Sequence, residues 1–132
     1  MRESVKNPLG TPPEVVILIA DDDPLILSLL RDILCPVGYQ VLEAANGNQA
    51  LSQLRQRKVD LIITDLMMPG MDGLELIRAV RREFPEIPMI AMSGGFGEQF
   101  LPIAEVLGSQ AILSKPFKVD RVKEMVGGLW RR

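Results

Sequence analysis

Five short apolar runs are spaced along the chain, and each has the length and aliphatic composition of a buried strand. Runs of this kind, without a strict alternation of polar residues, are typical of a parallel sheet that is covered on both faces. The runs occupy residues 15–20, 40–44, 61–64, 89–92 and 111–113.

Between these runs, apolar residues recur at spacings of three and four, which predicts helices. Pro36 and Gly38 are expected to end the first helix, and Asn46-Gly47-Asn48 to form a turn before the second. Pro102 interrupts the fourth helical pattern and makes it the weakest. The predicted helices include residues 25–34, 50–54, 74–80, 100–107 and 119–129.

Regular alternation of strands and helices predicts an α/β fold with right-handed crossovers and helices on both faces of the sheet. We expect a doubly wound, five-stranded parallel sheet with the flavodoxin-like order 2-1-3-4-5, an order adopted from known sheets of this type. Residues 1–13 are rich in proline and polar residues and are expected to form a flexible N-terminal tail. Residues 14–132 are expected to fold as a single domain.

The composition excludes several classes of function. A net charge of -2 gives no reason to expect direct binding of nucleic acid. A single cysteine, Cys35, and the absence of histidine exclude an internal disulfide and a zinc ligand set, and Cys35 is interpreted as a small buried hydrophobe. No signal peptide and no run long enough to span a bilayer is present, so we expect a cytoplasmic protein without membrane insertion.

Polar side chains follow four of the predicted strands. Asp21 and Asp22 come after the first, Asp65 after the third, Ser93 after the fourth, and Lys115 shortly after the fifth. The carboxyl ends of parallel strands share one edge of a sheet, so these residues are expected to share one site. Carboxylates 4 Å apart repel by roughly 4 kcal/mol per pair at an effective dielectric constant near 20, so a shared proton, a lysine or a hard divalent cation must compensate.

Asp23 stands apart from this group because Pro24 follows it. An acidic residue directly before a proline is typical of a helix N-cap, so we interpret Asp23 as a cap and not as a metal ligand.

Three motifs in this order resemble the receiver domain of two-component response regulators, including the chemotaxis regulators. They are Ile-Leu-Ile-Ala-Asp-Asp-Asp-Pro, Ile-Ile-Thr-Asp-Leu-Met-Met-Pro-Gly-Met-Asp-Gly-Leu-Glu-Leu and Ser-Lys-Pro-Phe. The resemblance covers roughly residues 14–129 and implies a phosphoryl acceptor and switch, not an enzyme beyond slow self-dephosphorylation.

The resemblance also implies specific roles. Asp65 would accept a phosphoryl group from a sensor histidine kinase or a histidine phosphotransfer protein, and a conformational change would signal to a downstream protein that the sequence does not identify. Mg²⁺ or Mn²⁺ would be bound by Asp21, Asp22, Asp65 and the backbone carbonyl of Met67, with Asp21 acting largely through water. Lys115 would pair with the phosphoryl oxygens, the Ser93 hydroxyl would hydrogen-bond to them, and the bond before Pro116 would be cis.

Three positions depart from the pattern of the family, in two respects. Ile112 stands where many receivers carry an aromatic switch residue, which puts a switch based on an aromatic rotamer in doubt. Met67 and Gly95, two residues after Asp65 and Ser93, have side chains that cannot orient a hydrolytic water, so we expect slow self-dephosphorylation.

Other interpretations stay open at this point. The chain could be a phosphate-independent interaction module on a receiver fold, or a receiver excised from a longer protein. A Mg²⁺-dependent aspartate-nucleophile phosphohydrolase would need a second acid where this chain has Met67. Two further groups of residues bear on the surface of the protein. Met67, Met68 and Met71 could fill the core or form a partner surface, and Arg78, Arg81 and Arg82 are expected to form a solvated helix face.

Overall fold

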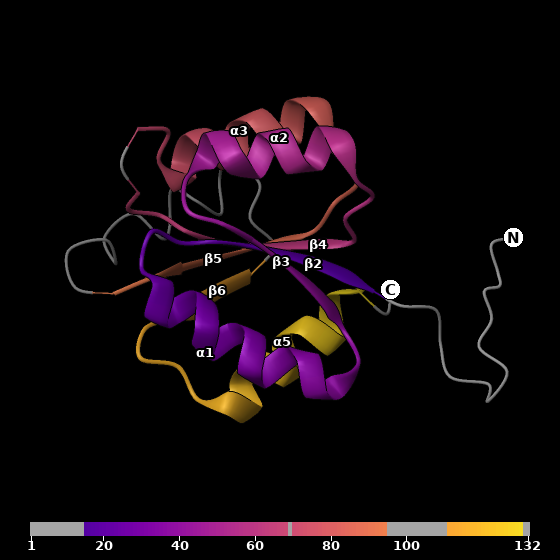
Figure 1. The fold of residues 1–132 in the computed structure, drawn as a ribbon, viewed down its shortest axis with the longest axis vertical. Coiled ribbons are helices and arrows are strands. Elements are labelled where there is room, and N and C mark those ends of the chain that lie inside the picture. Colours follow the sequence, from indigo (N-terminus) through magenta and orange to yellow (C-terminus); the bar gives the residue numbers. More distant parts are fainter. Residues whose placement is uncertain (1–14, 69, 95–110, 131–132) are drawn as a thin grey trace, which may run out of the picture.

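The computed structural model describes residues 15–68, 70–94 and 111–130, and Figure 1 shows its ribbon. The predicted tail (1–13) and the predicted helix at 100–107 lie outside the described residues. The strands are β2 (Val16–Ala20), β3 (Gln40–Ala44), β4 (Leu61–Asp65), β5 (Met89–Ser93) and β6 (Ala111–Ser114). The helices are α1 (Pro24–Leu34), a 3-10 turn (Cys35–Val37), α2 (Gly47–Gln56), α3 (Gly73–Glu83) and α5 (Val119–Trp130).

The strands form one parallel sheet in the order β3-β2-β4-β5-β6. Counted along the chain this is the order 2-1-3-4-5, which confirms the predicted fold. β2 lies between β3 and β4, with Leu18 paired to Leu42 on one side and to Ile62 on the other. The carboxyl ends of β2 and β4 are therefore direct neighbours.

Helices cover both faces of the sheet. In Figure 1, α2 and α3 lie on one face and α1 and α5 on the other. Successive residues of a strand point to opposite faces, so Leu18 packs beneath α2 and α3 whereas Ile17 and Ile19 pack with residues of α1 and α5. All three are fully buried. Each such side chain contributes about 1.5–3 kcal/mol relative to an exposed one, and the two cores hold the strand ends in place.

Acidic side chains begin α1 and α3. The Asp23 carboxylate accepts a hydrogen bond from the backbone N–H of Leu25 at 2.9 Å, with Pro24 in the first helical position, so the predicted cap is confirmed. Asp72 and Glu75 form a capping box at α3, with backbone-to-side-chain distances of 2.9 and 3.2 Å. Each cap satisfies N–H groups that the helix leaves unpaired at its start.

The predicted turn at Asn46-Gly47-Asn48 is wrong. Asn46 is the N-cap of α2 and accepts a hydrogen bond from the N–H of Gln49 at 2.8 Å, so the helix begins at Gly47. Asparagine favours helix caps and turns through the same side-chain hydrogen bond to nearby backbone. The sequence pattern alone therefore does not separate the two.

Three side chains also differ from expectation. Cys35 is exposed because it starts the 3-10 turn after α1. Arg81 is half-buried, and its guanidinium donates to the carbonyl of Pro85 at 2.6 Å and to that of Ile87, whereas Arg78 and Arg82 are exposed as predicted. Val119, an apolar residue at the start of the predicted helix 119–129, is 46% exposed at the first position of α5.

Substitution of the α1 cap is expected to weaken the fold. Asp23→Ala should lower the free energy of unfolding by about 1 kcal/mol, because the N–H of Leu25 loses its acceptor. Urea unfolding followed by circular dichroism measures this change. Asp32→Ala, at an exposed position later in the same helix, is the control and should change stability little. Equal stability of the two variants would contradict the capping role.

Candidate functional site

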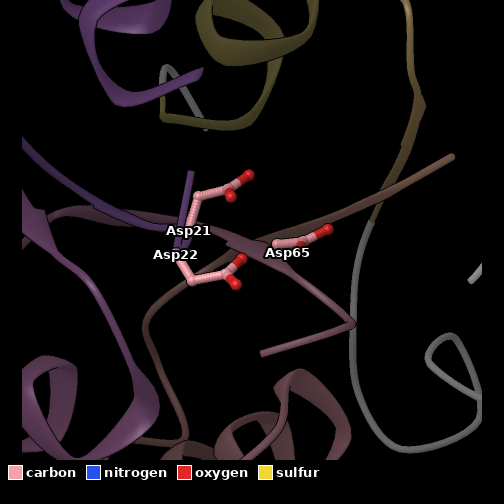
Figure 2. A group of neighbouring side chains, drawn as sticks. All are labelled: Asp21, Asp22 and Asp65. Atoms are coloured by element: carbon pink, nitrogen blue, oxygen red, sulfur yellow. The ribbon is translucent and has the colours of Figure 1, made fainter. Parts of the chain in front are cut away.

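Three carboxylates meet where β2 and β4 end. Asp21 and Asp22 directly follow β2, and Asp65 is the last residue of β4. Figure 2 shows the three side chains gathered at this edge, and their carboxylate oxygens lie within 4.8 Å of one another. Asp21 is fully buried, Asp65 is 5% exposed, and Asp22 is exposed. The structure thus brings together the acids that the sequence placed at one sheet edge.

Lys115 joins this cluster from the end of β6. Its Nζ lies 2.9 Å from Oδ2 of Asp21 and 3.2 Å from Oδ1 of Asp65. The backbone N–H of Lys115 donates to the carbonyl of Ser93 at 2.8 Å, which ties the lysine to β5. The Lys115–Pro116 peptide bond is cis, as the resemblance implies.

Gly94 is a site-supporting residue that the sequence analysis did not identify. A Cβ at this position would lie 2.9 Å from Cβ of Lys115, so glycine leaves room for the lysine to approach. The sequence signal that could have identified Gly94 is its position directly after Ser93, the hydroxyl residue at the end of a strand.

The carboxylates of the cluster outnumber its one ammonium group, that of Lys115. Burial, followed by the charge of Asp21, raises the pKa of Asp65 to about 6, and Lys115 only partly opposes this rise. Burial alone would lower the pKa of Lys115, but its hydrogen bond to Asp21 and the nearby carboxylates raise it. Above pH 6, three carboxylates therefore face one ammonium group, so the cluster favours a further positive charge.

Ser93 completes the set at the end of β5. It is fully buried, and its Oγ has no hydrogen-bond partner among the described residues. A buried hydroxyl without a partner is costly, and its presence beside a charged site indicates a role in binding.

The three methionines that follow Asp65 divide between core and surface. Met68 is buried and Met71 packs half-buried against the core beneath α2 and α3, whereas Met67 is 49% exposed. Met68 and Met71 therefore fill the core. Of the three methionines, only Met67 has a side chain exposed enough to contact a partner.

The donor set fits a hard divalent cation. Carboxylate oxygens are the ligands that Mg²⁺ prefers, and a cation of this kind keeps several waters, which the exposed side of Asp22 can accommodate. The cluster contains no cysteine or histidine ligand, so softer metals are not favoured.

A doubly wound parallel sheet with acids, a hydroxyl and a lysine at its carboxyl edge places this chain among the α/β proteins that carry their ligand site at that edge. The family model of the response regulator receiver domain matches residues 17–127, and the chain belongs to this family of two-component signalling domains. None of the helices in the described part of the chain is long and apolar enough to cross a membrane.

The chain is similar to curated and structurally known receivers. It is 41% identical over 101 residues to response regulator GtcR of Aneurinibacillus migulanus, covering 76% of this chain and 41% of GtcR. It is 35% identical over 111 residues to sporulation initiation phosphotransferase F of Bacillus subtilis, covering 83% of this chain and 89% of that protein. The receiver domain of NtrX from Brucella abortus superimposes with a TM-score of 0.81 at 29% identity, covering 85% of this chain and 95% of that one.

The raised pKa of Asp65 predicts a pH-dependent cost to stability. Because ionised Asp65 is disfavoured in the fold, the contribution of Asp65 to stability should fall as pH rises from about 4 to about 6. Asp65→Asn cannot ionise and should be more stable than wild type by about 1–3 kcal/mol at pH 8 in the presence of a chelator. The difference should shrink below pH 6 and vanish below about pH 4.

Urea unfolding at pH 8, 6 and 4 measures this dependence. Asp32→Asn, which removes an exposed carboxylate outside the site, is the control and should follow the wild type at each pH. Equal stability of Asp65→Asn and wild type at pH 8 would contradict the destabilising charge.

Proposed function

We propose that this protein accepts a phosphoryl group on Asp65 in a Mg²⁺-dependent reaction and signals to a partner protein through a conformational change. The observation that carries this proposal is the buried Asp65 carboxylate, held 3.2 Å from the Lys115 ammonium and within 4.8 Å of two further carboxylates. Membership of the receiver family supports it.

The reaction assigns a task to each residue of the cluster. A carboxylate oxygen of Asp65 attacks phosphorus, the phosphorus–nitrogen bond of a phosphohistidine breaks, and its electron pair stays on the imidazole nitrogen. Lys115 neutralises charge on the phosphoryl oxygens. Asp22, Asp65 and the carbonyl of Met67 would hold Mg²⁺, with Asp21 acting largely through water, and the bound ion would supply the further positive charge that the two anionic reactants need.

Ser93 links this chemistry to a change of shape. Its buried Oγ, unpaired among the described residues, can donate to a phosphoryl oxygen on the neighbouring strand end. Ile112 lies on β6 opposite Ala91 and packs half-buried on the core beneath α2 and α3. With no aromatic ring at Ile112, we expect displacement of the ends of β5 and β6, and not a ring rotation, to transmit the change.

The proposed phosphoryl donor is a sensor histidine kinase or a histidine phosphotransfer protein. Relatives of the chain include sensor protein EvgS of Escherichia coli, 36% identical over 118 residues that make up 10% of that protein. Exposed apolar side chains suited to partner contact lie near the site carboxylates along the chain, namely Leu25 (76% exposed), Leu29 (43%) and Met67 (49%).

The downstream target is a protein of unknown identity, and a cytoplasmic location stays a prediction.

Two alternative functions, a phosphate-independent interaction module and a phosphohydrolase, would give other results in the experiment described below. A phosphate-independent interaction module would retain a cluster of like charges whose cost no ligand offsets. A phosphohydrolase would need an acid or base near the nucleophile, but the residue two positions after Asp65 is the exposed, apolar Met67.

Incubation with acetyl phosphate tests the proposal directly. We expect intact mass spectrometry to show one added phosphoryl group on the wild type with Mg²⁺, and none when Mg²⁺ is chelated, because Asp65 is then a poor nucleophile. Asp65→Asn should stay unmodified, whereas Asp60→Asn, a carboxylate outside the cluster, should be modified like the wild type. No addition from acetyl phosphate or from a phosphorylated histidine phosphotransfer protein would favour the phosphate-independent module.

The exposed thioether of Met67 predicts a long-lived phosphoryl group. Met67→Asn should accelerate its loss by about tenfold or more, since an amide can orient an attacking water and a thioether cannot. The decay of the phosphorylated mass after removal of acetyl phosphate measures the lifetime. Leu29→Asn, also an exposed apolar residue changed to an amide, is the control. Equal lifetimes for Met67→Asn and wild type would contradict this role of Met67.

A further inference from the structure

Thr64 lies directly before Asp65 on β4 and is fully buried. It pairs with Ala20 of β2 and with Ala91 of β5, and both alanines belong to the apolar core beneath α2 and α3. A valine would fill this place with nearly the same shape and without a polar atom. Because a buried hydroxyl in apolar surroundings costs free energy unless it is hydrogen-bonded, the bond that Thr64 makes is informative.

The Thr64 hydroxyl donates a hydrogen bond to the backbone carbonyl of Asp65 at 3.0 Å. This carbonyl belongs to the proposed phosphoryl acceptor itself. The two residues are adjacent in the chain, so the hydroxyl acts on the acceptor directly. A core side chain is thus joined to the peptide group that follows the Cα of Asp65.

The same peptide group is held at two further points. Its N–H, which is that of Leu66, donates to the carbonyl of Met92 at 3.1 Å. On the side of α3, a Cβ at Gly73 would lie 2.1 Å from the carbonyl oxygen of Asp65, so no side-chain atom fits between this carbonyl and the start of the helix. Rotation of the peptide group is therefore restricted.

The orientation of this peptide group affects where the Asp65 carboxylate lies. The peptide defines the ψ angle of Asp65, and the rotamers open to a side chain depend on the φ and ψ angles of its residue. Oδ1 of Asp65 lies 3.2 Å from Nζ of Lys115. A turned peptide would change this distance and the direction from which the carboxylate meets phosphorus.

We infer that Thr64 is a positioning residue for the phosphoryl acceptor. Its hydroxyl holds the carbonyl of Asp65, and through the backbone it holds the carboxylate in the orientation for attack. Successive side chains of a strand point to opposite faces, so the hydroxyl acts through the backbone and not on the phosphoryl group. This inference rests on the proposed function, because it assumes that Asp65 is the nucleophile.

Variants that differ only in the hydroxyl at position 64 test the inference. Initial rates of phosphorylation by acetyl phosphate are followed by intact mass at saturating Mg²⁺, where urea curves show each variant to be folded. Thr64→Val keeps the shape of the side chain, and its rate should be about tenfold below that of the wild type, since small misplacements of a reacting group slow a reaction. Thr64→Ser keeps the hydroxyl and should stay within about threefold of the wild type, whereas Thr64→Ala should be about tenfold slower than Thr64→Ser.

Ile62→Val is the matched control for packing. Ile62 is fully buried in the same core, two residues earlier on β4. Its substitution removes a methylene group and should lower stability, as Thr64→Ser does by losing a methyl group, but the rate should equal that of the wild type. The order of the rates should follow the hydroxyl and not the stability of the variants, which a purely structural role would not produce.

The outcomes separate this inference from the proposed function. A phosphorylated wild type with equal rates for wild type and Thr64→Val, or for Thr64→Ser and Thr64→Ala, would overturn the positioning role alone. If one variant does not fold, the other comparison decides. A wild type that takes no phosphoryl group from acetyl phosphate or from a phosphorylated histidine phosphotransfer protein would overturn the proposed function and the positioning role with it.

Discussion

Repulsion among carboxylates at one edge of the sheet is the constraint on which the rest of the site depends. Asp21, Asp22 and Asp65 each place one carboxylate oxygen within 4.8 Å of the other two. Two like charges 4 Å apart repel by roughly 4 kcal/mol at an effective dielectric constant near 20, and by less where solvent screens them, as at the exposed Asp22. Lys115 contacts two of these carboxylates but only partly opposes burial and the charge of Asp21, which together raise the pKa of Asp65 to about 6. The remaining cost is free energy that a bound cation can recover, so instability of the free protein and affinity for a cation have the same origin.

The fold keeps these charges together because they stand at the end of a strand or directly after one. Ala20 pairs with Thr64 in the centre of the sheet, so the residues that follow them cannot separate without breaking the ladder. Apolar cores on both faces make such a break costly. Asp23 adds to this order: its carboxylate caps α1, and its N–H donates to Asp21 at 2.9 Å. A repulsive cluster is thus maintained by the packing of the whole domain.

The sequence predicted the parts of this structure that depend on periodicity. Five apolar runs defined the strands, and the rule that parallel strands end at a common edge predicted that Asp21 and Asp65 would meet. It did not predict features that depend on the local path of the backbone. Asn46 could begin a turn or a helix, and Cys35 is exposed because a 3-10 turn follows α1. The close approach of Gly47, at the start of α2, to Met71, where a Cβ on the glycine would lie 2.7 Å from Cγ of the methionine, joins segments that only the strand order brings together.

The unsatisfied groups of the site favour a cation and a phosphoryl group together over either alone. A phosphoryl group by itself would add negative charge to carboxylates that already outnumber the ammonium group of Lys115. A cation by itself would relieve that repulsion but leave the Ser93 hydroxyl without an acceptor among the described residues. Under the proposed function, a bound cation would offset the charge of both the carboxylates and the phosphoryl group, and the Ser93 hydroxyl would gain an acceptor. The excess negative charge and the unpaired hydroxyl would then be satisfied by the same pair of ligands, which would couple the proposed phosphorylation to local structure.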